Sequence, residues 1–121
     1  MLTDLKVDKD NDRITWKYNG NEYTRQFNKI DQAVFDKTID CIFLLIPSFP
    51  QPNKLHVLNS YGEDIAEIPP PDGAKFYYLT TKNDNEVIMV CAFSDKLDGW
   101  YDWHYSYDHF TKTLIRETPA F

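Results

Sequence analysis

The residues best able to do chemistry lie in one segment near the carboxyl end of the chain, where aromatic and polar side chains alternate. Successive side chains of a β-strand point to opposite faces, so a strand here would separate the two kinds. One face carries Trp100, Asp102, His104, Ser106 and Asp108. The other carries the aromatic rings of Tyr101, Trp103, Tyr105 and Tyr107, which we expect in the core. The polar face could serve catalysis, metal binding or partner binding.

Catalysis and metal binding both fit this segment poorly. Same-face neighbours of one strand are about 6.8 Å apart, which is too far for the Ser–His hydrogen bond of a hydrolytic triad, and no nucleophile-elbow motif is present. The histidines and their neighbouring aspartate show neither the HExxH spacing nor the paired-cysteine spacing of zinc sites. These candidates are Asp102, His104, His109 and His56. We therefore predict no catalytic residue, no metal ligand and no cofactor.

Carboxylates beside a tryptophan are typical of a protein-binding surface. Carboxylates accept bidentate hydrogen bonds from arginine, and tryptophan anchors many interfaces. Residues 1–61 carry no net charge, whereas residues 62–121 hold five basic and eleven acidic side chains, the whole of the net charge of -6. An ordinary solubilising surface accounts for the same charges. We predict a basic protein partner that contacts Asp95, Asp98, Trp100, Asp102, His104 and Asp108.

Composition argues against several other classes of protein. The chain has 121 residues, of which 42% are hydrophobic and 16% aromatic, so we expect one folded domain, residues 1–121, and no intrinsic disorder. The acidic balance argues against direct binding of nucleic acid. The longest apolar run, Cys41–Ile46, is too short to span a bilayer, and the amino terminus does not resemble a secretory signal. We expect a cytoplasmic protein without membrane contact.

The two cysteines, Cys41 and Cys91, both stand in apolar surroundings. Free cysteines behave as small hydrophobic residues and are often buried. We therefore expect two buried free thiols. A disulfide between neighbouring strands is the alternative, although no other feature indicates an oxidising compartment.

The elements that position the polar face are predicted to be antiparallel strands. Arg13–Tyr18 and Glu22–Phe27 flank Asn19-Gly20, the strongest short signal for a type I′ hairpin. Cys41–Ile46 is predicted to be a central strand, because a continuous apolar run of this length is typical of burial on both faces. The remaining strands are expected around Leu5 and Val7 and at Lys54–Leu58, Glu63–Ile68, Phe76–Thr81, Val87–Phe93, Trp100–Tyr107 and Leu114–Glu117.

Residues 29–38 are predicted to form the one helix. Ile30, Ala33 and Val34 lie on one stripe at helical spacing, and Asn28 can cap the first turn, although Phe35 falls off the stripe. The sequence therefore predicts an α+β fold that is mainly antiparallel β. The strands would form a curved meander sheet or a sandwich with this short helix packed on it.

Several stretches of the second half of the chain carry a family resemblance. They are Leu55–Gly62, Ile68–Gly73, Gly99–Trp103 and Asp108–Leu114. In these stretches the chain resembles bacterial immunity proteins of polymorphic or contact-dependent growth-inhibition toxin systems. The resemblance implies a small, acidic cytosolic inhibitor that binds a toxin domain, often a nuclease, and blocks its active site or its approach to substrate. No functional residue is carried over, because these proteins differ in fold.

Two other functions remain open. An adaptor or structural domain of a phage or mobile element would use sheet edges that pair with other chains. A small enzyme would gather Asp102, His104 and Asp108 around one concavity between helix and sheet. The inhibitor is the favoured prediction, because the charge is asymmetric and no catalytic motif is present.

Overall fold

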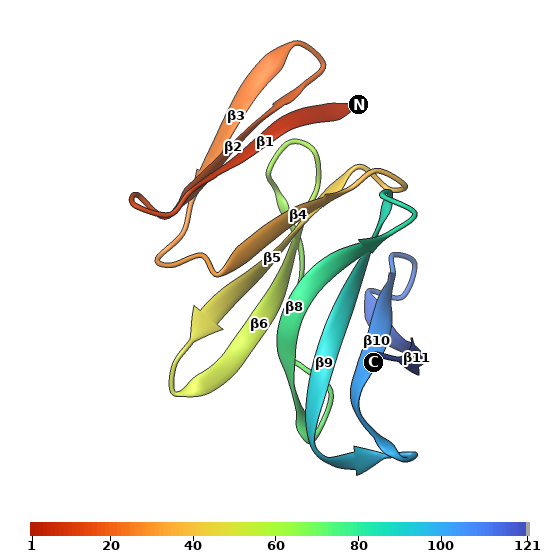
Figure 1. The fold of residues 1–121 in the computed structure, drawn as a ribbon. Helices are drawn as coiled ribbons and strands as arrows, with labels where there is room; N and C mark the ends of the chain where they lie inside the picture. Colours follow the sequence, from red (N-terminus) through yellow and green to blue (C-terminus); the bar gives the residue numbers. More distant parts are fainter. Residues whose placement is uncertain (121) are drawn as a thin grey trace.

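The computed structural model describes residues 1–120, which form eleven strands in three antiparallel sheets (Figure 1). The first sheet has the order β1 (Leu2–Asp8), β2 (Arg13–Tyr18), β3 (Asn21–Gln26). The middle sheet has the order β4 (Gln32–Asp36), β5 (Cys41–Ser48), β6 (Gln51–Leu58), β7 (Asp64–Ile68). The third sheet has the order β8 (Ala74–Lys82), β9 (Glu86–Leu97), β10 (Trp100–Asp108), β11 (Thr113–Pro119). Each sheet is therefore a meander of consecutive strands.

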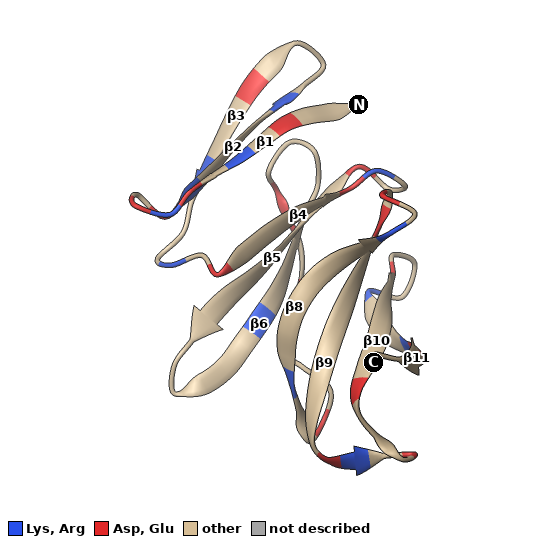
Figure 2. Ribbon diagram, in the orientation of Figure 1, with Lys and Arg blue, Asp and Glu red and all other residues tan. Residues whose placement is uncertain are grey.

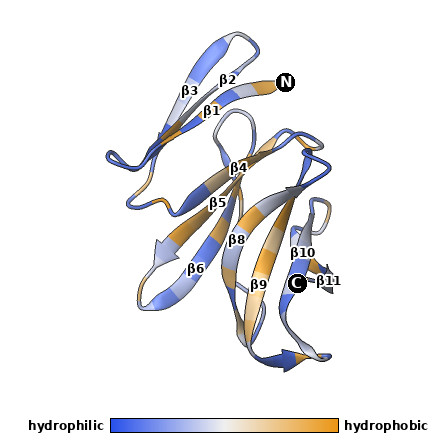
Figure 3. Ribbon diagram, in the orientation of Figure 1, coloured by the Kyte–Doolittle hydropathy of each residue, from blue (hydrophilic) through white to orange (hydrophobic). Residues whose placement is uncertain are grey.

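The middle sheet packs against the other two, and β5 is buried on both of its faces. Phe43 and Leu45 belong to the core shared with the third sheet, whereas Ile42 and Leu44 belong to the core shared with the first. Figure 3 shows the high hydropathy along β5 and β9. The predicted central strand is confirmed, because only a strand between two packed layers needs apolar side chains at every position.

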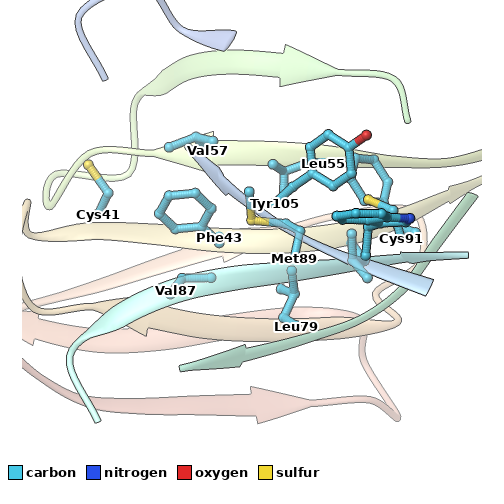
Figure 4. Close-up of a cluster of buried hydrophobic side chains, with 12 residues drawn as sticks. Cys41, Phe43, Leu55, Val57, Leu79, Val87, Met89, Cys91 and Tyr105 are labelled. Atoms are coloured by element: carbon cyan, nitrogen blue, oxygen red, sulfur yellow. The ribbon is translucent and has the colours of Figure 1, made fainter. Parts of the chain in front are cut away.

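The core between the middle and third sheets holds both cysteines (Figure 4). Cys41 lies on β5 and Cys91 on β9, and both thiols are free and buried. Burial raises the pKa of Cys41 to about 11 and that of Cys91 to about 12. Both residues act as small apolar core side chains, as the sequence predicts, and the alternative disulfide is not formed.

The predicted helix at 29–38 is wrong, because Gln32–Asp36 is the strand β4. Ala33 and Phe35 pack toward the first sheet and Val34 toward the third, which is the period of a strand with two covered faces. Phe35, which falls off the helical stripe, pairs with Ile42 of β5. Residues 1–120 contain no helix, so within them the fold is all-β rather than α+β.

The end of β4 shows why the strand is preferred. The carboxylate of Asp36 accepts hydrogen bonds from the backbone N–H of Thr38 at 2.8 Å and from that of Val87 on β9 at 2.9 Å. At the other end, the side-chain oxygen of Gln32 accepts a bond of 2.7 Å from the N–H of Leu79 on β8. These bonds join the middle and third sheets at both ends of β4. A helix would bring Gln32 and Asp36 within one turn of each other, so the two side chains could not reach these separate partners.

The other predicted strands are confirmed to within a few residues at each end. Asn19 and Gly20 have φ of 52° and 78°, the positive values that a type I′ turn needs at both central positions. The antiparallel part of the predicted fold is therefore correct. Residues 1–120 contain no helix long and apolar enough to cross a membrane.

Candidate functional site

The strand β10 separates its two kinds of side chain over most of its length. Trp103 and Tyr105 are buried in the core between the sheets, and Tyr107 packs against that core. His104 and Ser106 therefore lie on the outward face of the third sheet. The expectation of a core position is wrong for Tyr101, whose side chain is 52% exposed.

A change of register in the third sheet explains the exposure of Tyr101. Leu97 pairs with Trp100 and Ala92 pairs with Asp102, so residues 93–96 of β9 face a single residue of β10. Extra residues on one strand bend it and strengthen its twist. The end of β9 turns away from the sheet, as Figure 1 shows, and carries residues 95–101 with it. We call these residues the β9–β10 tip.

The β9–β10 tip presents two exposed aromatic side chains. Trp100 is 43% exposed and Tyr101 is 52% exposed. The ammonium group of Lys96 lies 5.6 Å from the centroid of the Tyr101 ring. Asp98 and Gly99, with φ of 49° and 90°, form the turn itself. The tip therefore places aromatic and charged groups together on a bent, two-stranded projection.

Trp103 and Arg116 hold the tip in place from behind, and we call this pair the Trp103–Arg116 clamp. The indole N–H of Trp103 donates to the carbonyl oxygens of Leu97 at 3.0 Å and of Trp100 at 3.2 Å. The Arg116 guanidinium lies 4.4 Å from the centroid of the Trp103 ring and pairs with the Asp98 carboxylate at 2.8 Å. The tip is thus pre-organised by a buried ring and a cation from β11.

A groove of about 350 Å³ lies on the outward face of the third sheet, and we call it the outer groove. Its lining includes Thr80, Lys82, Glu86, Ile88, His104 and Glu117. His104 Nδ1 lies 3.2 Å from Thr118 Oγ1, and the Ser106 hydroxyl donates to Glu117 at 2.6 Å. These bonds, together with the strand pairing, orient His104 and Glu117 at the groove.

The structure divides the predicted partner-binding residues among four places. Asp95, Asp98 and Trp100 lie at the tip, and His104 lines the outer groove. Asp102 lies between these places, and its carbonyl oxygen accepts a bond of 2.9 Å from the N–H of Ala120. Asp108 lies at the far end of β10, about 27 Å from Trp100 for a strand rising about 3.4 Å per residue. The tip and the groove are neighbours, but Asp108 is remote.

Asp108 serves the turn between β10 and β11. Its carboxylate accepts hydrogen bonds from the backbone N–H groups of Phe110 at 2.9 Å and Thr111 at 3.3 Å. These bonds lower the pKa of Asp108, because they stabilise its charged form. This aspartate has a structural role that the strand alternation alone did not indicate.

The charge asymmetry of the sequence does not become one acidic surface. Asp64 pairs with Arg25 at 3.2 Å, and Glu67 pairs with Lys54 at 3.3 Å, so cations of the first half neutralise acids of the second. At the tip, Lys96 lies between Asp95 and Asp98 in the chain, and Figure 2 shows the acidic and basic positions side by side. The tip is therefore mildly acidic and mixed in charge.

The candidate catalytic and metal-binding groups do not come together. Ser106 bonds to Glu117 and His104 to Thr118, so the serine and histidine of the considered triad have other partners. His104 lines the outer groove, whereas Asp102 and Asp108 do not. The described residues contain no group of three or more His, Cys, Asp or Glu side chains that could hold a metal ion.

A second hollow, of about 430 Å³, lies between the first and middle sheets, and no motif of the sequence indicates it. Arg25 of β3 crosses to the middle sheet, donating to the carbonyl oxygen of Gly62 at 2.8 Å and to both carboxylate oxygens of Asp64 at 3.2 Å. Burial lowers the pKa of His56, which faces Phe27 edge-on at 6.1 Å. No pattern along the chain pairs these residues, because they come from different sheets.

The β9–β10 tip and the outer groove are neighbours on the third sheet. The tip offers exposed aromatic rings on a backbone that the clamp already orders, and the groove offers oriented polar groups. Comparison with protein-family models, with curated proteins and with solved structures finds no match for this chain.

Proposed function

We propose that this protein is an inhibitor of the immunity type, which binds a toxin domain and blocks its active site or its approach to substrate. The observation that carries the proposal is the β9–β10 tip, where Trp100 and Tyr101 are exposed on a turn held by the Trp103–Arg116 clamp. Nucleases are one class of toxin that presents a basic cleft to such an inhibitor.

The clamp favours tight binding because it removes part of the entropic cost of association. Each flexible side chain that must be ordered at an interface costs about 0.5–1.5 kcal/mol, and a pre-ordered loop avoids much of that cost. Trp and Tyr are also the side chains most often found at the centre of protein interfaces. Trp100 and Tyr101 combine both properties, since the tip backbone is tied to Trp103.

The charges of the tip favour a basic partner. Asp95, Asp98 and Asp102 lie near the aromatic rings, and a partner cation can share Asp98 with Arg116. Such charges speed association and select the partner more than they add affinity. We therefore expect a modest dependence of binding on salt. Asp108 is left out of the proposed contact, because it bonds its own turn.

Co-expression with the product of each neighbouring reading frame tests the proposal. We expect one product to be toxic alone, harmless in the presence of this protein and co-purified with it. Trp100→Ala should weaken the complex by about 30-fold or more, the usual loss at the centre of an interface. Phe110→Ala is the matched control, because this ring is 86% exposed but lies on the β10–β11 turn.

Two outcomes would contradict the proposal. One is that no neighbouring product binds, in which case a stable homo-oligomer would favour the adaptor function. The other is that Trp100→Ala and Phe110→Ala have equal effects on the affinity of a complex that does form. That result would move the interface away from the tip.

A further inference from the structure

We propose that the outer groove receives an arginine side chain of the partner. This inference rests on the proposed function and adds a second contact beside the tip. The groove lies on the outward face of the third sheet, which no other sheet covers (Figure 1). Its volume of about 350 Å³ is at the small end of the range for ligand pockets and suits one long side chain better than a helix or a strand.

The floor of the groove is apolar although it faces outward. Ile88 is 7% exposed, and its neighbour on the same face of β9, Val90, is 1% exposed. Val90 lies between Tyr78 and His104 in the register of the sheet, and Ile88 lies opposite Thr80. Of these two residues only Ile88 lines the groove, and with the methyl groups of the lining threonines it can accommodate the aliphatic stem of a long cationic side chain. Arginine and lysine bury such stems readily while keeping the charge near polar groups.

The walls supply acceptors for the charged end. Glu86 is half-buried and takes part in none of the ion pairs found in residues 1–120. Glu117 is oriented by the bond of 2.6 Å from Ser106, which is itself buried. Lys82 lies directly opposite Glu86 in the register of the sheet, but the two do not form an ion pair, so the Glu86 carboxylate can accept hydrogen bonds from a further cation. The two glutamates outweigh the single ammonium of Lys82, which lies exposed at the end of β8.

Arginine fits these acceptors better than lysine does. A guanidinium presents five N–H donors in a flat fork that can meet a carboxylate with two bonds and reach a further acceptor. The groove offers two carboxylates and the hydroxyl oxygens of Thr80 and Thr118 around its floor. Lysine has three donors at one point and would satisfy fewer of these groups.

The position of the groove assigns the arginine to the same partner as the tip. His104 is four residues along β10 from Trp100, a separation of about 14 Å at the usual rise of a strand. A single standard interface spans such a distance easily. The partner would thus pack on Trp100 and Tyr101 at the tip and insert its arginine between Glu86 and Glu117.

A titration of the full chain with N-acetyl-arginine methylamide tests the groove without the partner. We expect amide NMR shifts at residues 80–82, 86–88 and 117–118, and at most weak shifts with the neutral isostere N-acetyl-citrulline methylamide. Glu86→Gln should reduce the shifts several-fold, whereas Glu22→Gln, an exposed charge change on β3, should leave them unchanged. Equal shifts with both probes, or shifts elsewhere, would overturn the inference.

The complex supplies the second test. Glu86→Gln and Glu117→Gln should each weaken partner binding by about tenfold or more, with Glu22→Gln as the control and thermal unfolding as the check that each variant folds. Full affinity in both groove variants would overturn the inference and leave the inhibitor function standing. Failure of every candidate partner to bind would overturn the function, and the arginine titration would still decide whether the groove binds a guanidinium.

Discussion

Two turns of this protein are held by the same pair of side chains, a tryptophan and an arginine, but to different ends. At the turn between β6 and β7, the Trp16 indole donates to the carbonyl oxygen of Ser60 at 2.7 Å, and Arg25 reaches Gly62 and Asp64. We call this pair the Trp16–Arg25 joint. The Trp103–Arg116 clamp repeats the arrangement at the β9–β10 tip.

The two arrangements differ in which parts of the fold they join. At the joint, Tyr61 of the turn contacts the rings of Tyr18 and Tyr23, with centroids 5.2 Å and 6.1 Å apart, and Trp16 is 1% exposed. The first sheet thus supplies the aromatic partners. Tyr61 itself is 55% exposed, much as Trp100 and Tyr101 are at 43% and 52%, so the two turns differ in what they join and not in how far their rings are exposed. The joint ties the first sheet to the middle sheet, whereas the clamp ties a turn to strands of its own sheet.

The largest expected effect comes from removing the tryptophan of the joint. Trp16→Ala should lower the free energy of unfolding by about 3–5 kcal/mol, because it leaves a cavity and an unpaired Ser60 carbonyl. Trp100→Ala at the tip should cost less, because this residue is 43% exposed and Trp16 is 1% exposed. Urea denaturation of both variants measures the difference. Similar losses would show that the tip is as integral to the fold as the joint.

The glycines of the two turns allow a matched comparison. Gly62 and Gly99 have φ of 84° and 90°, so alanine at either position should cost about 1–2 kcal/mol of backbone strain. A Cβ at Gly62 would also lie 2.9 Å from Trp16 Cη2, whereas at Gly99 nothing lies within 4 Å. Gly62→Ala should therefore cost a further 1–3 kcal/mol or so.

Thermal and urea unfolding check the glycine pair, and a background variant supplies the control. In Trp16→Phe the atoms that a Cβ at Gly62 would meet are absent, so the extra cost of Gly62→Ala should shrink. An extra cost that persists there would mean that strain in the turn, and not the contact with Trp16, separates the two glycines.

Substitution of the two arginines should affect different properties: Arg25 the stability of the fold, and Arg116 the binding of the partner. Arg25→Met should cost about 1–2 kcal/mol, because it removes an ion pair and leaves the Gly62 carbonyl without its donor. Arg116→Met should cost less than about 1 kcal/mol, because it loses an exposed ion pair and a cation–π contact. If the clamp pre-organises the tip, Arg116→Met nevertheless weakens partner binding and Arg25→Met does not. Calorimetric titration with the partner distinguishes the two, and the opposite order would contradict the comparison.

The smallest expected effect is a pH dependence at His56, which lines the hollow between the first and middle sheets together with Arg25. Burial lowers the pKa of His56 below 6.5, with Glu67 and Asp64 acting against burial and Arg25 and Lys54 acting with it. The unfolded chain therefore binds a proton at His56 before the folded chain does, and stability falls as pH drops below about 6.5. Urea midpoints between pH 7.5 and 5 should show this fall. His56→Gln should flatten it, while His109→Gln, an exposed change, should not.

Patterns within one strand or one turn were predicted well from the sequence. Asn19-Gly20 specifies a hairpin because few residues accept positive φ, and that preference needs no distant contact. The apolar run Cys41–Ile46 specifies a strand covered on both faces, with Cys41 free. The same local rule placed Trp103 and Tyr105 in the core.

Features that depend on residues far apart in the chain were not predictable in this way. The spacing of residues 32–36 alone is compatible with a short helix. The strand is selected by contacts with distant residues, since Asp36 accepts a hydrogen bond from Val87 and Phe35 pairs with Ile42. The excess of acidic residues in the second half of the sequence does not form one acidic surface in the fold, because Arg25 and Lys54 of the first half pair with two of its carboxylates. Such pairings cannot be read from spacing.

For the candidate site, the sequence by itself determined the alternation of β10, since strand geometry fixes which side chains share a face. Only the tertiary structure decided that Tyr101 is exposed, that Asp108 serves a turn and that Glu86 and Glu117 share a groove with His104. The physical reason is that bulges, turn bonds and sheet order place side chains according to neighbouring strands, and the choice of neighbours is made by the whole fold.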